Sequence, residues 1–309
     1  MDVGDVIAEK YEVRRVLEVG GRSTLLEAIE LAEERFVVIE LFRKFRVQNA
    51  NERFLRELAN VAKLQSEHVA RVFGTGTEPD GSNYVVSEPQ EGESLETLLR
   101  RQGPLPLVRL VELTLQVCEA LAEAHQAQIV HQDLSPETLF LTRLVDGTSV
   151  MKIRDFGVRL ATAAITEGRM FTAPRYTAPE QLPHSTYVDQ RTDIWALGAV
   201  MYELSTGRRP FEQAREQLEM ALLTSEPVSL RELRPGLPIP FVDTVMRCLS
   251  RSPGARYSSA ADVAEAIAPF GPNRGQGMAG TVRGVLTAGA TRLRESTEIV
   301  RHMVRARKP

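Results

Sequence analysis

Residues 131–138 read His-Gln-Asp-Leu-Ser-Pro-Glu-Thr, and Asp-Phe-Gly follows at 155–157, 22 residues after the aspartate of the first stretch. Ala-Pro-Glu then stands at 178–180, Asp-Ile-Trp-Ala-Leu-Gly at 193–198, and an arginine at position 256. Any one of these short stretches could arise by chance in an unrelated protein. Their shared order and spacing form a specific signal, and the rest of the chain is interpreted around them.

The part of the chain before these motifs is predicted to form strands around one helix. Short β-rich runs at 11–17, 24–31 and 35–42 are separated by turn or charged residues. Apolar residues recur at helical spacing within 52–65. The later part of the chain has mostly helical patterns. A β-rich first part and a helix-rich second part predict an α+β fold of two lobes, with a hinge near 88–92.

The composition is typical of a soluble globular protein. Of the 309 residues, 43% are hydrophobic and 26% charged, which excludes a mainly disordered chain, a collagen-like fibre and a disulfide scaffold. Cys118 and Cys248 stand in apolar helical patterns and are expected to be buried thiols. No apolar run approaches the roughly 18 residues of a membrane helix, and the N-terminus is acidic, so a cytoplasmic location is expected.

The net charge of −3 hides an uneven distribution. Residues 271–309 contain eight basic and two acidic side chains, a net of +6, so the other 270 residues carry −9. The overall balance argues against a general nucleic-acid binder. Residues 271–280 indicate a linker, and the apolar residues after it lie near one face of a predicted basic amphipathic helix. That helix could pack on the protein, contact an anionic membrane surface weakly through 279–307, or bind a partner or the chain's own acidic cleft; disorder is the remaining alternative.

The motifs resemble those of eukaryotic-type protein kinases, with a character similar to the bacterial Ser/Thr kinases. The resemblance covers residues 11–270 and implies a small lobe at 11–90 and a large lobe at 91–270, after an N-terminal extension at 1–10. In this family a glycine-rich loop covers the ATP phosphates and a strand lysine pairs with a helix glutamate. A catalytic-loop aspartate orients the substrate hydroxyl, while an asparagine and the aspartate of Asp-Phe-Gly bind Mg²⁺.

Several structural positions of the family are retained. The resemblance implies a helix glutamate, two members of an internal hydrophobic stack, a buried ion pair of the large lobe, and an acid that caps the catalytic-loop backbone. These positions are Glu57 for the helix acid, His131 and Phe156 for the stack, Glu180 and Arg256 for the ion pair, and Asp193 for the cap. Asp133 and Asp155 match the catalytic-loop aspartate and the metal-binding aspartate, and both are expected to be vestigial.

The positions that carry the chemistry have changed. The phosphate-holding lysine of the strand is Glu40, and the first glycine of the loop is Glu18, although Gly20 is present. The arginine and lysine of the catalytic loop and its metal-binding asparagine are replaced, as is the threonine of the substrate-binding segment. These replacements are Gln132, Ser135, Thr138 and Ala173.

The changes place negative charge where a triphosphate would lie. Glu40 would face Glu57 near Asp155, and Glu18 and Asp133 would border the same cleft. At an effective dielectric of about 20, two unit charges about 4 Å apart interact by roughly 4 kcal/mol. Replacing the lysine by a glutamate is therefore expected to cost several kcal/mol of ATP binding. Rescue by Arg22 from the loop is an alternative.

The hinge is expected to be neutral toward a nucleotide. With Ser87 as the residue before the hinge, Gln90 would donate its N–H to adenine, and Glu88 is a further position expected to border the nucleotide. Val38 above the base and Phe140 below it are larger than usual, so the slot for the base should be narrower. Shape and charge therefore both argue against ATP.

Plainer interpretations remain open for four of these positions. Gly20 could belong to an ordinary hairpin turn, and Glu40 could be a solvated charge at the edge of a strand. Asp155 could cap a turn, and Asp133 could serve backbone hydrogen bonding alone. None of these alternatives involves binding of a ligand.

The sequence therefore predicts a catalytically impaired protein kinase-like protein that acts as a scaffold or regulator of a protein partner. In this interpretation no cofactor is bound. The first alternative is a weak or atypical Ser/Thr protein kinase that uses Mg-ATP, with Asp155 as the metal ligand. The second is a peptide- or protein-binding module that uses the acidic cleft or the basic tail. The oligomeric state is not indicated.

Overall fold

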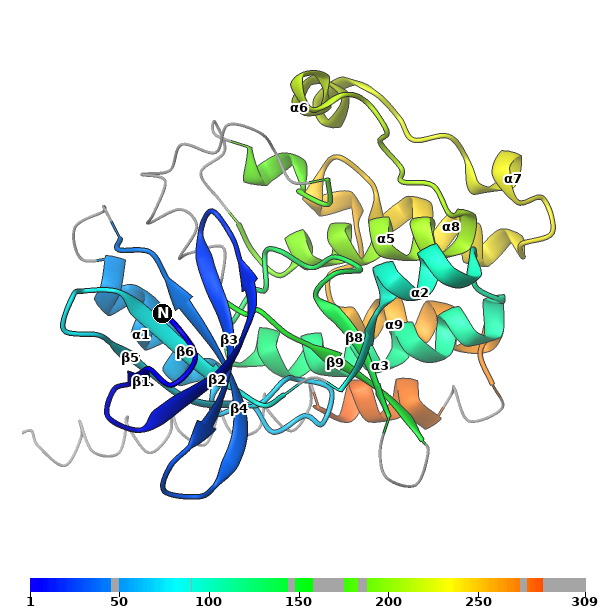
Figure 1. Ribbon diagram of the computed structural model, residues 1–309. Helices are drawn as coiled ribbons and strands as arrows, with labels where there is room; N and C mark the ends of the chain where they lie inside the picture. The colour runs from blue at the N-terminus through cyan, green and yellow to red at the C-terminus, as the bar shows by residue number, and fades with distance from the viewer. Residues whose placement is uncertain are drawn as a thin grey trace, which may run out of the picture.

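The computed structural model has two lobes (Figure 1). It describes residues 1–45, 50–89, 91–143, 148–157, 175–182, 188–272 and 277–285, with the backbone alone at 215 and 216. A sheet with one helix forms the small lobe, and helices form most of the large lobe. This arrangement confirms the predicted two-lobed α+β fold.

The small lobe is a six-stranded antiparallel sheet in the order β1-β2-β3-β4-β6-β5. Its strands are β1 (Val6–Ile7), β2 (Tyr11–Val19), β3 (Ser23–Glu30), β4 (Arg35–Phe42), β5 (Val72–Thr77) and β6 (Asn83–Ser87). Residues 1–10 were expected to be an extension, but β1 pairs with β2 and Ile7 is fully buried. Burial of Ile7 in the core of the sheet explains why this segment joins the small lobe.

One helix, α1 (Ala50–Val61), packs against the small-lobe sheet. Phe54, Leu58 and Val61 recur at helical spacing and are all buried. Phe54 forms an edge-to-face contact with Phe42 of β4, with ring centres 5.2 Å apart. This contact holds the helix beside the strand that carries Glu40.

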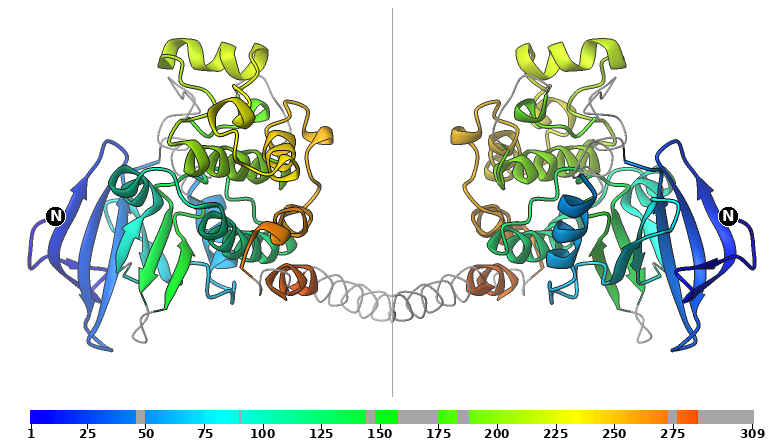
Figure 2. Two further views of the ribbon diagram at one scale, coloured as in Figure 1. Left: turned by 90° about the vertical axis from the view of Figure 1, so that its right-hand side faces the viewer. Right: turned by 90° about the vertical axis from the view of Figure 1, so that its left-hand side faces the viewer.

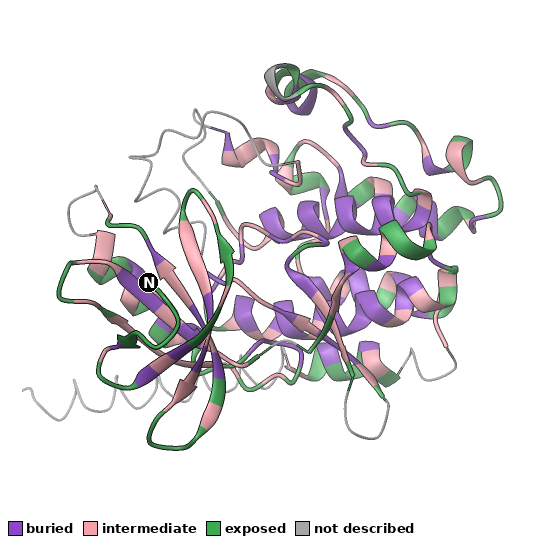
Figure 3. Ribbon diagram, viewed as in Figure 1, coloured by how far each residue is buried: buried purple, intermediate pink, exposed green. Residues whose placement is uncertain are grey.

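The large lobe is built around α3 (Leu107–Gln126) and α5 (Arg191–Thr206), which are buried over most of their surfaces (Figure 3). The other helices surround them: α2 (Leu95–Gln102), α6 (Arg215–Thr224), α7 (Leu230–Leu233), α8 (Ile239–Cys248) and α9 (Ala260–Ile267). Short 3₁₀ turns lie at η1 (Pro179–Gln181), η2 (Pro253–Ala255) and η3 (Ala268–Phe270). No helix in the described part of the chain is long and apolar enough to cross a membrane.

A second, three-stranded sheet lies next to the hinge. It consists of β7 (Gly92–Ser94), β8 (Leu139–Arg143) and β9 (Ser149–Ile153), in that order. The Ser94 hydroxyl accepts a hydrogen bond from the Thr97 N–H at 3.2 Å and so caps the start of α2. The catalytic-loop motif precedes β8, and Asp-Phe-Gly follows β9. This small sheet therefore positions both motifs.

The first part of the basic tail is helical at 277–285 and lies against the large lobe (Figure 2). Ala279 and Val282 are buried against the main core, and Arg283 forms ion pairs with Asp262 and Glu265 of α9. The linker predicted over 271–280 is therefore wrong at its end, because burial of apolar side chains stabilises a helix from residue 277. The rest of the proposed amphipathic helix lies outside the described residues.

Candidate active site

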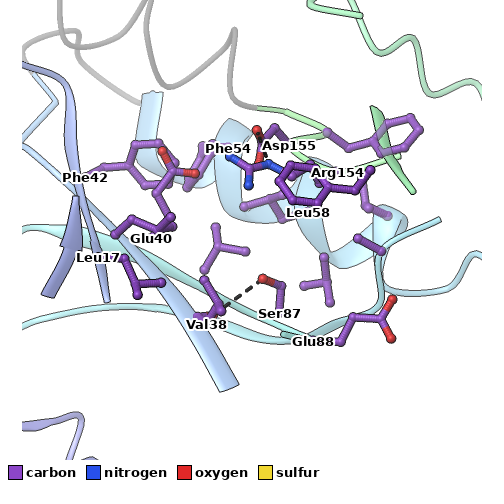
Figure 4. A pocket seen from close by; sticks show the side chains of 17 residues that line it. Leu17, Val38, Glu40, Phe42, Phe54, Leu58, Ser87, Glu88, Arg154 and Asp155 are labelled. Carbon is purple, nitrogen blue, oxygen red and sulfur yellow. Dashed lines mark hydrogen bonds and ion pairs between the residues drawn. The ribbon is translucent and has the colours of Figure 1, made fainter. Parts of the chain in front are cut away.

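Two adjoining cavities lie between the lobes. The larger, about 270 Å³, has mostly apolar walls, which include Leu17 and Val38 of the small lobe (Figure 4). Phe140 of β8 also lines it. The smaller, about 250 Å³, is lined by the turn between β2 and β3 and by charged residues. Four residues line both cavities: Leu25, Glu40, Arg154 and Asp155. The cavities therefore meet at a charged junction.

Glu40 reaches this junction because of the alternation of side chains along β4. Val37 and Ile39 are fully buried in the small-lobe core, whereas Val38 and Glu40 line the larger cavity. The register is fixed on both sides, since β4 pairs with β3 and with β6. A carboxylate thus faces the cavity at the position where the kinase resemblance implies a lysine.

The surroundings of Glu40 favour its neutral form. Burial, followed by the negative charge of Asp155, raises the pKa of Glu40 to about 7. The Ser23 hydroxyl donates a hydrogen bond to Oε1 of Glu40 at 2.6 Å, and the charges of Arg22 and Arg154 also favour the carboxylate. Near neutral pH, Glu40 is therefore divided between its neutral and its charged form.

Glu57 lies on α1. Partial burial raises the pKa of Glu57, while the positive charge of Arg53 acts in the opposite direction. In the described part of the chain, no ion pair joins Glu57 to a basic side chain. The charges that most affect the pKa of Glu40 are those of Asp155, Arg22 and Arg154. The expected charge repulsion between Glu40 and Glu57 is therefore not the dominant interaction of Glu40.

Arg154 immediately precedes Asp-Phe-Gly and enters the same junction. Its Nε donates to Oδ2 of Asp155 at 2.9 Å, and its guanidinium carbon lies 4.9 Å from the centre of the Phe140 ring. Asp155 has a φ of +68°, in the left-handed region, where the chain turns into Phe156 and Gly157. Arg154 stands one residue outside the Asp-Phe-Gly motif, so the family motifs did not predict a basic side chain at this junction.

Asp193 fixes the backbone of the catalytic loop from the start of α5. It accepts hydrogen bonds from the N–H groups of His131 at 2.9 Å and Gln132 at 2.8 Å, and it contacts Nε2 of His125 at 2.7 Å. Burial alone would raise the pKa of Asp193. The His125 contact, the charges of His125 and His131, and the Gln132 N–H hold that pKa below its usual value.

His131 and Phe156 are in contact, with ring centres 4.5 Å apart. Nε2 of His131 lies 2.9 Å from the carbonyl oxygen of Arg154, so the same histidine also holds the strand that leads into Asp-Phe-Gly. Phe156 is buried and lines the larger cavity together with Leu58 of α1. The stack therefore connects the catalytic loop, Asp-Phe-Gly and the helix of the small lobe.

The catalytic loop holds Asp133 and Thr138 in different environments. Asp133 is partly buried, and its N–H donates to Nδ1 of His131 at 3.2 Å. Thr138 is buried, and its hydroxyl accepts from the Ser135 N–H at 3.0 Å and donates to the Ser135 carbonyl at 3.1 Å. The Thr138 hydroxyl is thus engaged in a local turn rather than directed at a ligand.

The residues present do not fit the Mg²⁺ ion that the kinase resemblance implies. Asp155 is bound to Arg154, and Thr138, at the position of the metal-binding asparagine, is engaged with Ser135. Among the residues that the structure describes, no group of three or more His, Cys, Asp or Glu side chains could hold a metal ion. Hard divalent cations prefer several oxygen ligands, which this arrangement does not supply.

The hinge residue Glu88 is tied to its surroundings. Its Oε1 lies 3.0 Å from the Lys152 ammonium of β9 and accepts from the Arg71 N–H at 3.1 Å. The Glu88 N–H in turn donates to the Arg71 carbonyl at 2.9 Å. Gln90 and Ala173, two positions that the resemblance implicates, lie outside the described residues.

Gly20 belongs to a tight turn above the smaller cavity. Its N–H donates to the Ser23 carbonyl at 2.9 Å, and a Cβ placed on Gly20 would come 3.2 Å from the same oxygen. Glu18 and Arg22 line this cavity on either side of the turn. The arrangement fits an ordinary hairpin turn that carries one acid and one base toward the cleft.

A buried ion pair supports the large lobe beneath the cleft. Arg256 donates to both oxygens of Glu180, at 2.6 and 2.8 Å, and the Arg256 side chain is fully buried. Thr192 adds a third hydrogen bond to Glu180 at 2.9 Å. Through these contacts and a further hydrogen bond from Arg256 to the Arg191 carbonyl, the pair joins η1 to α5 and to the end of η2.

Comparison with known proteins agrees with this geometry. Residues 11–267 match the protein kinase domain family. The chain is 31% identical over 270 residues to serine/threonine-protein kinase pkn3 of Myxococcus xanthus, covering 84% of this chain and 49% of that protein. It is 30% identical over 270 residues to serine/threonine-protein kinase PrkC of Bacillus subtilis, covering 85% of this chain and 41% of that protein. The chain thus spans about half, or less, of these relatives.

Solved structures show the same fold. The crystal structure of the Mycobacterium tuberculosis PknI kinase domain matches with a TM-score of 0.71 and 22% identity, covering 87% of this chain and 99% of that one. At this identity the likeness concerns the fold alone. The family match over 11–267 covers most of the chain and agrees with the motifs, the lobes and the cleft. This chain therefore belongs to the protein kinase family.

Proposed function

We propose that this chain is a regulatory member of the protein kinase family, which does not transfer phosphate from Mg-ATP and acts by binding a protein partner. The observation that carries the proposal is Glu40, whose carboxylate faces the cavity from β4. The kinase resemblance implies a lysine there that holds the ATP phosphates.

The charge change at position 40 is large enough to matter. At an effective dielectric of about 20, a unit-charge pair about 4 Å apart contributes roughly 4 kcal/mol. A glutamate therefore removes an attraction of this order and adds a repulsion while it is charged. Each 1.4 kcal/mol or so is a factor of ten. Phosphate transfer relies on positioning and charge stabilisation, so its rate is expected to fall at least about 100-fold.

The features that support the fold are retained while those that support the chemistry are changed. The Asp193 cap and the Glu180–Arg256 ion pair are formed, and both lie away from the cavity walls. At the junction of the cavities, Glu40 and the engaged Asp155 stand where phosphate transfer needs a lysine and a metal. A rigid domain that no longer needs turnover suits a role in binding a partner.

The second candidate is an atypical Ser/Thr protein kinase. The names of the similar proteins, which are Ser/Thr protein kinases, favour this candidate over the first. Asp133 and Asp155 are also present, and the His131–Phe156 stack is formed. In this case Asp133 would orient the substrate hydroxyl, and Arg22 or Arg154 would have to supply the charge of the missing lysine.

A phosphate-transfer assay separates the two candidates. The chain is incubated with γ-labelled Mg-ATP, and label is measured on the chain itself and on added acceptor proteins, with Asp133→Ala as the matched control. The regulatory role predicts equal label for wild type and Asp133→Ala. Label that disappears in Asp133→Ala would establish the second candidate and exclude the first.

A further inference from the structure

Arg154 lies where the two cavities of the cleft meet. It lines both of them together with Glu40 and Asp155, and its guanidinium lies beside the Asp155 carboxylate (Figure 4). On another side the guanidinium lies over the ring of Phe140, whose side chain forms part of the apolar wall of the larger cavity. A fixed positive charge is thus held between an apolar space and a polar one.

Only part of the hydrogen-bonding capacity of the Arg154 guanidinium is used within the described residues. Its Nε is bound to Asp155, but the structure records no hydrogen bond from its two terminal nitrogens to any described residue. The Arg154 side chain is 29% exposed to solvent. Guanidinium groups bind phosphate through parallel N–H donors. The terminal nitrogens of Arg154 can therefore receive an anionic group that enters the junction.

The same contact excludes a divalent cation from its usual place. The Nε atom of Arg154 lies 2.9 Å from the Asp155 carboxylate. A metal ion bound to the same carboxylate would therefore lie close to the Arg154 guanidinium, and two cations this close repel each other. Thr138 offers no second ligand, because its hydroxyl is engaged with Ser135. The positive charge at Asp155 is thus already supplied by the chain itself.

Arg154 also changes the charge of the cleft. Glu18, Glu40 and Asp155 carry the negative charge around the smaller cavity, while Arg22 and Arg154 offset most of it. A phosphate group at the junction therefore meets much less repulsion than the acids alone would produce. The larger cavity beside it is apolar enough to accept a heterocyclic base.

We propose that Arg154 takes the place of the divalent metal, so that the cleft binds a nucleoside diphosphate or triphosphate without Mg²⁺. The base would occupy the larger cavity, and the phosphates would meet Arg154 at the junction. This inference rests on the proposed function, because a chain that transferred phosphate from Mg-ATP would need the metal at Asp155. In this account the cleft of a regulatory chain binds a nucleotide but does not catalyse phosphate transfer.

The test is calorimetric titration of the full chain with ADP, once in EDTA and once in millimolar Mg²⁺. The expected dissociation constants for wild type agree within about threefold. Arg154→Gln, whose stem can still lie on Phe140, should weaken binding in EDTA by at least about tenfold, because it removes a charged donor. Arg100→Gln, an exposed arginine of α2, is the matched control and should bind as wild type does.

Three results would overturn the inference: affinity that rises more than threefold with Mg²⁺, unchanged binding by Arg154→Gln, or no binding of ADP in either buffer. The comparison of ADP affinity in the two buffers uses the wild-type chain, so it tests the inference even if Arg154→Gln does not fold. Failure to bind ADP leaves the proposed function standing. Mg²⁺-dependent binding together with phosphate transfer that Asp133→Ala abolishes would overturn both.

Discussion

The Nε atom of Arg154 lies 2.9 Å from the Oδ2 atom of Asp155, its neighbour in the chain. This contact places a positive charge at the point where the family motifs alone indicate only acids. It also engages the carboxylate that a metal would need. The cleft of this chain therefore differs from the expected acidic cleft, because an arginine and a glutamate occupy the region where a lysine and a metal would act.

Glu40→Gln should change the pH dependence of stability. The pKa of Glu40 is raised to about 7 in the fold, mainly by burial, from 4.5. The folded chain therefore holds a proton that the unfolded chain has released, and the wild-type free energy of unfolding falls as pH rises from about 4.5 to 7. The Glu40→Gln side chain does not titrate, so its free energy of unfolding should not show this fall. In urea unfolding, the stability of Glu40→Gln relative to wild type should therefore rise by up to about 3 kcal/mol by pH 8.

Ser23→Ala provides the control for this effect. The Ser23 hydroxyl donates to the Glu40 carboxylate and stabilises its charged form. Without that bond the pKa of Glu40 rises further, and the fall in stability should extend to higher pH. A stability difference between wild type and Glu40→Gln that is constant from pH 5 to 8 would contradict the environment described for Glu40.

Arg256→Ala should destabilise the large lobe strongly. Arg256 makes two hydrogen bonds to Glu180 and three more to backbone carbonyls, and its side chain is fully buried. Its loss leaves a nearly buried carboxylate without its charged partner, which costs about 3–5 kcal/mol. Arg100→Ala removes an exposed pair with Glu96 and should cost less than about 1 kcal/mol. Equal effects in chemical denaturation would argue against the structural role of the Arg256 pair.

The start of the tail should contribute to stability. Val282 is fully buried against the large lobe, so Val282→Ser should lower the free energy of unfolding by about 1.5–3 kcal/mol. Gly280 lies in the same helix with open space around its Cα, so Gly280→Ala should raise that energy by up to about 1 kcal/mol. If thermal denaturation shows no change in either variant, the helix at 277–285 does not pack as described.

The two cysteines should be unreactive in the folded protein. Cys118 and Cys248 are both buried and free, and burial raises the pKa of each thiol, that of Cys248 to about 12. Because the thiolate is the reactive form, an aromatic disulfide reagent should label neither until the chain unfolds. Rapid labelling under native conditions would show that the large-lobe core opens.

Much of the fold could be predicted from sequence because its signals are local. The order of His-Gln-Asp, Asp-Phe-Gly and Ala-Pro-Glu identified the family, and the period of apolar residues placed most of the small-lobe strands. The predicted helix at 52–65 ends earlier, at Val61, because the chain beyond it turns toward Ser66 and Val69. The strand at Val6–Ile7 has only two residues, too few to show an alternation of apolar and polar side chains.

The site was less predictable, since its charges come from separate segments. Alternation along β4 was enough to direct Glu40 into the cleft, but its bond to Ser23 depends on the pairing of β3 with β4. Arg154 was overlooked because it stands one residue outside the motif and because sequence alone does not show that its side chain turns back onto Asp155. Of the five acids expected around the cleft, Glu18, Glu40 and Asp155 line the two cavities, while Glu57 and Asp133 line neither. The charge balance also differs from the expected one, because Arg154 stands among these acids.

The most direct measurement is the rate of phosphate transfer from Mg-ATP by the full wild-type chain, compared with Asp133→Ala prepared in the same way. A regulatory protein with a glutamate at position 40 and an arginine bound to Asp155 predicts no transfer above that of Asp133→Ala. A wild-type rate that falls at least about tenfold on Asp133→Ala would contradict the central claim and identify an atypical Ser/Thr protein kinase.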